Sequence, residues 1–456
     1  MCDSNSTPRP SDRFAVPALV VTAVVLWALL WLFAHADRTL AMRGRQMGLF
    51  FAAFGVFLIA SVLVWRRGAN APHGLMWFVV ITGVVMRLTL APVRPVTTSD
   101  IYRYLWEGRV VRSGHNPYLY APNAPQLASL RDGMWPLVQH KSVPAAYPPV
   151  AQYVFALSDA LPTDRVITLK LVLALFDIGT VLLLPGLLVR LGRPPSWVLL
   201  YAWHPLVVGE VVARGHLDSI GIFFLVLALR LALLGSRRAC LAAGACFSAS
   251  ILAKGYALLV LPFLLAKARA RWAFLAGLAA AAAAAYSPFL SAGGAAVSGA
   301  LSYLSRWQGN ASAFTLVDLA LRPASTSHDA LARFICSGLL LAWLASLVTG
   351  MRRQPARLSW TDASFLALAG LLILSPVVYP WYLAWTVPFL CLRPRVGWLL
   401  LTGTIFSFYA HDFAGHHVEI QWVTALEYGV PALVGVAAAW RARRESAAPV
   451  IGATCA

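Results

Sequence analysis

Charged residues are scarce in this 456-residue chain, where they make up 12% of the sequence against 59% hydrophobic residues. Apolar runs long enough to cross a bilayer recur along the whole chain. This composition is typical of a polytopic membrane protein. The sequence therefore excludes a soluble enzyme and predicts an all-α bundle with about 13 or 14 transmembrane spans.

Motifs for bound metals, disulfides and nucleotides are also missing. The 6 cysteines form no Cys-X-X-Cys pair and have no histidine at ligand spacing, so neither a metal site nor a disulfide framework is predicted. No GxGxxG or P-loop pattern occurs at a strand-to-helix turn. His411, His416 and His417 with Asp412 and Glu419 match no divalent-metal spacing and favour a solvated loop. No cofactor is required, and a divalent cation has no support.

Acidic residues are fewer than basic ones, 18 against 37, which gives a net charge of +19. The basic residues lie in short loops between apolar runs, where they orient a membrane protein with its positive loops in the cytoplasm. A nucleic-acid partner is therefore not predicted. The surplus of basic residues is interpreted as setting the orientation of the chain in the membrane, and a second role would be binding of an anionic lipid headgroup.

Alternating the apolar segments across the membrane defines the expected topology. Both termini fall in the cytoplasm, and the loop that contains Asp100 falls outside together with Arg214, Asp218 and Lys254. The chain is expected to be one domain, with N-terminal spans at 1–92, an external catalytic loop at 93–147, further helices at 148–440 and a cytoplasmic tail at 441–456. The apolar segment at 149–161 is too short to cross and is expected as a half-inserted or juxtamembrane helix. The spans are expected near 15–36, 48–65, 75–92, 166–189, 197–213, 217–234, 239–253, 255–267, 272–290, 329–349, 361–378, 380–392, 396–411 and 422–440.

The loop residues from Asp100 to Pro122 are unusually polar for this chain. Asp100, Tyr104 and Glu107 recur on one face of a helix, and Arg103 lies one turn before Glu107. This pattern predicts an amphipathic helix on the membrane surface. A second interpretation of Asp100 is a first-turn carboxylate favoured by the helix dipole.

Further ionisable residues occur at membrane depth. Arg214, His216 and Asp218 lie between two apolar runs, Lys254 interrupts another, and Arg306 ends a third. Such residues are costly in a membrane and are usually paired, exposed to a cavity or functional. His216 and Asp218 could satisfy one another in a turn, and Lys254 could extend to the interface. A phosphate role is favoured for Lys254 because several arginines are expected on the same side.

Several short motifs together resemble the bacterial GT-C glycosyltransferases that use polyprenyl-phosphate sugars, especially the mannosyltransferase-like members. The resemblance covers most of the chain from Asp100 to Tyr428. It departs from the family at Glu107, where aspartate is common, and in having three spans before the loop where many relatives have one. The motifs are Ser99 to Gly108 (SDIYRYLWEG), Asn116-Pro-Tyr118, Tyr120-Ala-Pro122, Tyr147-Pro-Pro149, Gly215-His-Leu-Asp218, Lys254, Tyr379-Pro-Trp-Tyr382 and Glu427-Tyr428.

The resemblance implies a reaction and roles for these residues. Asp100 maps onto the catalytic base of the family's first external loop. Chemistry requires a base for the acceptor hydroxyl and cations for the departing phosphate. The donor phosphate is expected to meet Lys254, Arg103, Arg214 and Arg306. The acceptor or sugar is expected to meet a larger polar and aromatic set: Glu107, Tyr104, His115, Asn116, Tyr118, Tyr147, His216, Asp218, Tyr379, Trp381 and Tyr382.

The expected reaction transfers a hexose, with mannose implied by the resemblance, from a polyprenyl phosphate to a glycolipid, polysaccharide or protein. Direct displacement would invert the anomeric centre. The expected location is a bacterial inner membrane, with the active site on the periplasmic or extracellular face. A transporter or flippase of a lipid-linked or anionic solute is the main rival, and a scaffold without chemistry is a third interpretation. The rival gives no reason for a long external loop and predicts an internal repeat that the sequence lacks.

Overall fold

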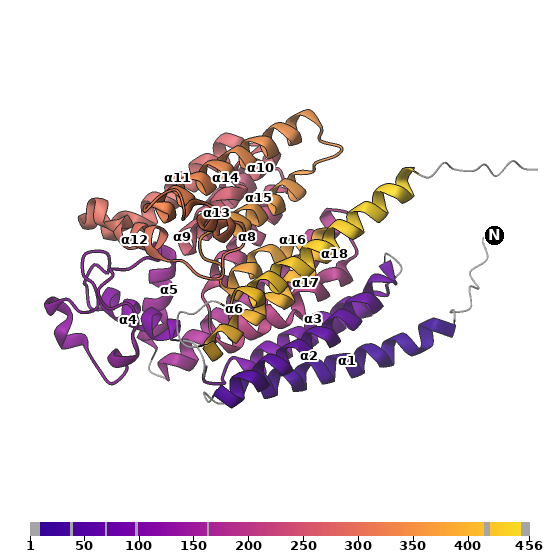
Figure 1. Ribbon diagram of the computed structural model, residues 1–456, viewed down its shortest axis with the longest axis horizontal. Coiled ribbons are helices and arrows are strands. Elements are labelled where there is room, and N and C mark those ends of the chain that lie inside the picture. Colours follow the sequence, from indigo (N-terminus) through magenta and orange to yellow (C-terminus); the bar gives the residue numbers. More distant parts are fainter. Residues whose placement is uncertain are drawn as a thin grey trace, which may run out of the picture.

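The computed structural model describes residues 10–36, 40–68, 71–95, 99–161, 164–414 and 420–447. These residues form an all-helical bundle without strands, apart from one isolated bridge between Gly309 and Val377. The helical membrane fold predicted from the apolar runs is therefore confirmed. The helices α4 (Asp100–Arg112), α5 (Pro149–Ala160) and α12 (Ser298–Arg306) lie together at one end of the bundle. The C-terminal end of α18 (Gln421–Ala447) lies at the other end (Figure 1).

Six helical segments in the described ranges are long and apolar enough to cross a membrane, or up to seven if a bent pair counts as one span. The expected 13 or 14 segments are nearly all helical, but many are too short to count as complete spans. The segments that qualify lie in α1 (Pro10–Ala34), α2 (Leu40–Trp65), α6 (Arg165–Arg190), α11 (Arg271–Tyr286) continued through η7 (Ser287–Val297) and α12 (Ser298–Arg306), α14 (His328–Arg353) and α18 (Gln421–Ala447).

Breaks in the backbone explain several of the short helices. The segment expected as one span at 197–213 bends by 60° between Pro195–Ala202 and Val207–Ala213. Pro205 lies in this break and cannot donate a backbone hydrogen bond to a preceding turn. Broken helices of this kind are tolerated in membranes where they line a cavity or are buried in protein. The bend therefore marks a place where the chain departs from simple spanning helices.

The remaining helices connect and pack around these spans. The α-helices are α3 (His73–Leu90), α4 (Asp100–Arg112), α5 (Pro149–Ala160), α7 (Leu199–Ala202), α8 (Asp218–Ala232), α9 (Arg237–Ala253), α10 (Leu261–Lys267), α13 (Ala313–Leu321), α15 (Trp360–Leu374), α16 (Val387–Leu392) and α17 (Val396–Thr404). The tighter or wider turns are η2 (Pro125–Leu130), η3 (Trp135–Leu137), η4 (Pro195–Val198), the π-helix η5 (Val207–Ala213), η6 (Gly255–Val260), η8 (Pro380–Thr386) and η9 (Ile405–Ala414).

The N-terminal helices are attached to the rest of the bundle by a buried ion pair. Arg87 of α3 donates from Nε to Asp177 of α6 at 2.6 Å, and both side chains are fully buried. Arg87 also donates to the carbonyl of Ala202 at 2.6 Å, and the hydroxyl of Tyr201 donates to Asp177 at 2.5 Å. Every charge in this network has a partner, as a buried charge requires. Helix α3 thus braces α6 and the broken helix, in an N-terminal region to which the resemblance gives no role.

The helix α4 differs from the predicted surface helix. Its buried residues include Ile101, Tyr104, Trp106 and Glu107, which cover more than one face. Gly108 of α4 lies so close to α5 that an added Cβ would stand 2.4 Å from the Phe155 carbonyl oxygen. The sequence suggested one polar face on the membrane, whereas α4 is enclosed by α5 and by the loop that follows it.

The helix α5 occupies the segment expected at 149–161 and has 12 residues. At 1.5 Å per residue it spans about 18 Å, which is shorter than a hydrocarbon core. Ion pairs attach its C-terminal end to neighbouring helices, with Arg112 at 3.0 Å and Arg165 at 3.2 Å from Asp159. Its expected position at the edge of the membrane stays a prediction.

Candidate active site

The site is built on the turn that follows the broken helix. The π-helix η5 leads into Arg214-Gly-His-Leu, and α8 starts at Asp218. Gly215 has φ of +80°, and an added Cβ would lie 3.1 Å from Ile101 of α4 and from Lys170 of α6. Glycine suits both the left-handed backbone and the close approach. Gly215 therefore brings the charged turn directly beneath the first residues of α4.

Asp100 stands at the open side of this turn and His216 lies beneath it. The Asp100 side chain is 37% exposed, and its Oδ2 lies 3.7 Å from Nδ1 of His216. Nε2 of His216 lies 3.4 Å from Oε2 of the fully buried Glu210. Neither ring nitrogen forms a hydrogen bond within the described part of the chain. The three residues form a row of carboxylate, imidazole and carboxylate that leads inward from the solvent.

Arg214 is held beside this row by a carboxylate and by aromatic rings. It donates from Nη1 to Glu210 at 2.9 Å, and its guanidinium lies 4.0 Å from the ring centre of Tyr409. Phe33 of α1 and Phe406 of η9 contact it at 5.2 Å and 5.1 Å. Its Nε has no hydrogen-bond partner among the described residues. Arg214 is thus positioned firmly while keeping one donor unused.

Lys254 forms the second cationic position. Its Nζ donates to Oδ1 of Asp218 at 2.7 Å, and Nε1 of Trp385 donates to the same oxygen at 2.6 Å. Lys254 follows the last residue of α9, where the backbone turns from helix to extended structure. Asp100 also interacts electrostatically with Lys254. The predicted partners Asp100, Asp218 and Lys254 are therefore brought into one cluster.

Aromatic side chains form a wall beside the charged cluster. Trp381 stacks on His216 with ring centres 3.8 Å apart, and Tyr379 stacks on Trp381 at 4.7 Å. Lys254 lies over the ring of Tyr382 at 4.2 Å. The hydroxyl of Tyr382 shares a short hydrogen bond with Tyr303 of α12. Flat rings beside carboxylates and cations provide surfaces on which a sugar ring can stack.

Other predicted residues hold the loop in place instead of facing the cluster. Arg103 donates from Nε to Glu107 at 2.6 Å, and the two side chains form a largely buried ion pair. Its other two nitrogens donate to backbone carbonyls at 139–143, the shortest being Val143 at 2.7 Å. Glu107 also accepts from Gln152 of α5 at 2.7 Å. The structure therefore places Arg103 and Glu107 in a clamp that joins α4, α5 and the loop.

The predicted Asn-Pro-Tyr motif has a similar structural position. The amide of Asn116 donates to Ser291 at 3.1 Å and its carbonyl accepts from the Tyr118 backbone at 3.1 Å. The buried Tyr118 hydroxyl donates to the backbone oxygen of Tyr147 at 2.9 Å. His115 contacts Tyr120 edge to face. These residues order the loop and attach it to η7.

Tyr147 and Tyr104 form the boundary between the loop and the cluster. Their rings meet at 5.4 Å, and Tyr104 stacks on Phe155 of α5 at 4.8 Å. Burial raises the pKa of Tyr147 well above its ordinary value, and the negative charge of Asp100 raises it further. Tyr147 thus stays a neutral hydroxyl near Asp100.

Arg306 and the C-terminal histidines are not part of the charged cluster. Arg306 is exposed at the C-terminal end of α12. His411 is buried and accepts from the backbone nitrogen of Ile420 at 2.9 Å. His416, His417 and Glu419 lie outside the described residues, as does the side chain of Asp412. Within the described ranges, no group of three or more His, Cys, Asp or Glu side chains could hold a metal ion.

Four further residues contact the cluster that were not predicted from the sequence: Glu210, Tyr409, Tyr303 and Trp385. Glu210 had a usable signal, because it is the single carboxylate in the apolar run VVGEVVA and an isolated charge at that depth indicates function or pairing. The aromatic residues gave no signal, since each resembles the many others in this chain. The missed residues all complete contacts made by residues that were predicted.

A helical membrane bundle with a half-exposed carboxylate, buried cations and stacked rings at one end has the groups that a membrane glycosyltransferase needs. The chain belongs to the alpha-(1->6)-mannopyranosyltransferase family, because the family model of the N-terminal domain matches residues 14–270. It is therefore a multi-pass membrane mannosyltransferase, a hexosyltransferase that depends on polyprenyl-phosphate mannose. No curated protein matches the chain. The matched region contains Asp100, Glu210, Arg214, Asp218 and Lys254.

Proposed function

We propose that the protein transfers mannose from a polyprenyl phosphate to a glycan or glycolipid hydroxyl at the α4 end of the bundle, with Asp100 as the catalytic base. The observation that carries this proposal is the single cluster of Asp100, His216, Asp218 and Lys254. A half-exposed carboxylate can reach an acceptor, whereas the cations lie deeper, where a lipid phosphate would sit. This face is proposed to be the periplasmic or extracellular side of a bacterial inner membrane.

The reaction needs one proton transfer and one displacement. Asp100 takes the proton of the acceptor hydroxyl as its oxygen attacks the anomeric carbon of mannose. The bond from that carbon to the phosphate oxygen breaks, and the phosphate leaves with both electrons. Lys254 and Arg214 stabilise the growing negative charge on the phosphate. Direct displacement inverts the anomeric centre, so an alpha product requires a donor whose mannose is β-linked.

His216 and Glu210 position the base in this proposal. His216 lies between the Asp100 and Glu210 carboxylates and stacks on Trp381. A fixed imidazole keeps the Asp100 carboxylate at a constant distance from the acceptor, and positioned bases contribute substantially to such reactions. Trp381, Tyr379 and Tyr382 are proposed to stack on the sugar rings of donor or acceptor.

The variant Asp100→Asn tests this proposal. It keeps the size of the side chain and removes its capacity to accept the proton. Loss of a general base typically costs about 10² to 10⁴ in rate, so transfer from a β-linked polyprenyl-phosphate mannose should fall by that factor while thermal melting stays unchanged. Mass spectrometry of the mannosylated product gives the rate.

The matched control is Asp132→Asn, which makes the same chemical change in the loop away from the cluster. This variant should retain transfer. Unchanged transfer by Asp100→Asn would reject Asp100 as base. A flippase would instead move labelled donor across vesicles without forming a glycosidic product, and that result would reject the enzymatic proposal for this site.

A further inference from the structure

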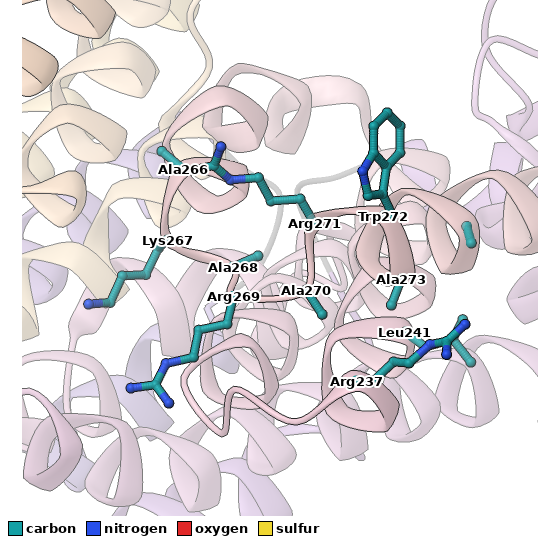
Figure 2. Close-up of a pocket in the computed structure, with 11 residues that line it drawn as sticks. Arg237, Leu241, Ala266, Lys267, Ala268, Arg269, Ala270, Arg271, Trp272 and Ala273 are labelled. Carbon is teal, nitrogen blue, oxygen red and sulfur yellow. The ribbon is translucent and has the colours of Figure 1, made fainter.

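A basic pocket lies between α9, α10 and α11, outside the catalytic cluster. It is an open pocket with a volume of about 880 Å³, lined by residues at the start of α9, the end of α10 and the start of α11. Figure 2 shows its charged side chains around the short loop at 268–270. Its cationic residues are Arg237, Lys267, Arg269 and Arg271.

These cations differ from those of the catalytic cluster because they lack acidic partners. The pocket lining contains no aspartate or glutamate. Within the described part of the chain, none of the four forms an ion pair, whereas Lys254 and Arg214 each have a carboxylate at less than 3 Å. Four like charges around one hollow repel one another. The pocket is therefore suited to an anion that neutralises them.

The pocket lies at the opposite end of α9 from Lys254. Helix α9 has 17 residues and runs from Arg237 to Ala253, directly before Lys254. At 1.5 Å per residue, its ends are about 25 Å apart. The chain then returns through η6 and α10 to Lys267. The pocket is thus nearly a hydrocarbon thickness away from the proposed phosphate site.

Several features place this pocket at the depth of lipid headgroups. The segment from Arg271 to Arg306 is a candidate membrane span, and the pocket stands at its first residues. Trp272 is 84% exposed beside the cations. Exposed tryptophan is typical of the interface between membrane and water. An exposed tryptophan at the start of a candidate membrane span favours a lipid headgroup over a soluble anion as the ligand.

The apolar part of the pocket continues along the helices. Leu241 of α9 is 48% exposed, and Ala273 and Ala276 line the α11 side. Gly244 and Gly277 let the two helices pack so closely that an added Cβ would stand 1.9 Å or 2.0 Å from the facing carbonyl oxygen. The result is a closely packed apolar wall beside the four cations, which matches a lipid with a charged headgroup and acyl chains.

We propose that this pocket binds the headgroup of an anionic phospholipid in the leaflet opposite the catalytic cluster. The phosphodiester would contact the cations, and an acyl chain would lie along Leu241 and the alanines of α11. Basic pockets between transmembrane helices recognise anionic headgroups in this way. By the expected topology this is the cytoplasmic leaflet. The proposal does not depend on the catalytic role of Asp100.

Native mass spectrometry of the full chain in detergent tests the proposal. Few phosphatidylglycerol molecules should bind per protein molecule, and they should bind more tightly than phosphatidylcholine. The double variant Arg269→Gln/Arg271→Gln should weaken phosphatidylglycerol binding at least tenfold, because each cation near a membrane surface contributes to headgroup affinity. The matched control is Arg352→Gln/Arg353→Gln, which removes two exposed charges from the end of α14. It should change binding less than twofold.

Three results would overturn the proposal. Equal losses in both double variants would indicate general surface charge instead of a site. Displacement of phosphatidylglycerol by inorganic phosphate at comparable concentration would indicate a soluble anion site. Binding of phosphatidylcholine as tight as that of phosphatidylglycerol would show that the cations do not select an anionic headgroup. The lipid-binding measurement uses no mannose donor, so its outcome does not depend on whether the protein transfers mannose. Thermal melting of each variant confirms that the variant is folded.

Discussion

Two charged clusters at the α4 end of the molecule differ in how fully their polar atoms are used. In the clamp formed by Arg103 and Glu107, each nitrogen of Arg103 donates to a carboxylate or carbonyl. In the proposed catalytic cluster, Nε of Arg214, both nitrogens of His216 and Oδ2 of Asp218 have no hydrogen-bond partner in the described part of the chain. Buried polar atoms without partners are costly. The donors of Arg103 are therefore already used within the protein, whereas the proposed catalytic cluster keeps polar atoms that no protein group contacts by a hydrogen bond.

The largest expected effect is a loss of stability when the clamp between Arg103 and Glu107 is removed. Arg103→Met leaves Glu107, which is 2% exposed, without its cation. Breaking a buried ion pair typically costs about 3 to 5 kcal/mol, so thermal melting in detergent should shift to clearly lower temperature. Mannosyl transfer per folded molecule should stay near the native value. A loss of transfer rate at unchanged melting temperature would mean that Arg103 acts at the donor phosphate, as first expected, and does not mainly stabilise the fold.

The second expected effect comes from removing Lys254, one of the two cations of the proposed catalytic cluster, together with its ion-pair partner Asp218. Lys254→Met/Asp218→Asn removes both members of the buried ion pair, so folding should be preserved. Loss of one electrostatic stabiliser typically lowers the rate 10² to 10³-fold, about 2.7 to 4 kcal/mol. Transfer should fall by that factor, and the decrease should appear in kcat. A fall in melting temperature with full activity would mean that Lys254 is structural, like Arg103.

The smallest effect concerns Asp132, which anchors the loop at the surface. Burial alone would raise its pKa, but hydrogen bonds from Arg109 and the Met134 backbone, with the charges of Arg109 and Arg165, hold it below its ordinary value. The stabilisation is therefore complete above the unfolded pKa of about 3.9 and is lost as pH falls through the lower folded value. Because Asp132 is 36% exposed, its contribution should be below about 1 kcal/mol.

Melting between neutral and acidic pH measures this contribution. Asp132→Asn should melt slightly below the native protein at neutral pH, and the difference should vanish in acid. A difference that grows as the pH falls would contradict the sign of the linkage. Transfer activity should be unaffected in either case, which keeps this loop anchor apart from the catalytic cluster.

Much of the fold follows from the length of apolar runs. The expected boundaries of α6 and α14 agree with the structure to within a few residues, because both runs are long and end at basic residues. The break in the expected span at 197–213 depends on Pro205 and on packing from distant helices, which a run of apolar residues does not record. The span count was therefore less predictable than the helices themselves.

The site was predictable where charge stood out against an apolar background. Asp100, Asp218 and Lys254 could be grouped because topology placed them on one side. Arg103 was expected at the donor phosphate, and its position in the clamp could not be predicted, since its partners include backbone carbonyls at 139–143 and every residue has a carbonyl. Nothing in residue type distinguishes such a clamp from a ligand site. Only geometry shows which donors are already used.

The buried pair of Arg87 and Asp177 has a consequence for the order in which the helices enter the membrane. The two residues are 90 positions apart, so α3 is synthesised well before its neutralising partner in α6. Arg87 lies in the last turn of α3, which has only 18 residues, and an arginine within a membrane segment is costly until it is paired. We expect α3 to insert poorly in chains that end before α6 and efficiently in chains that include it. Glycosylation mapping of truncated chains would detect this difference, and equal insertion of both would show that α3 settles without Asp177.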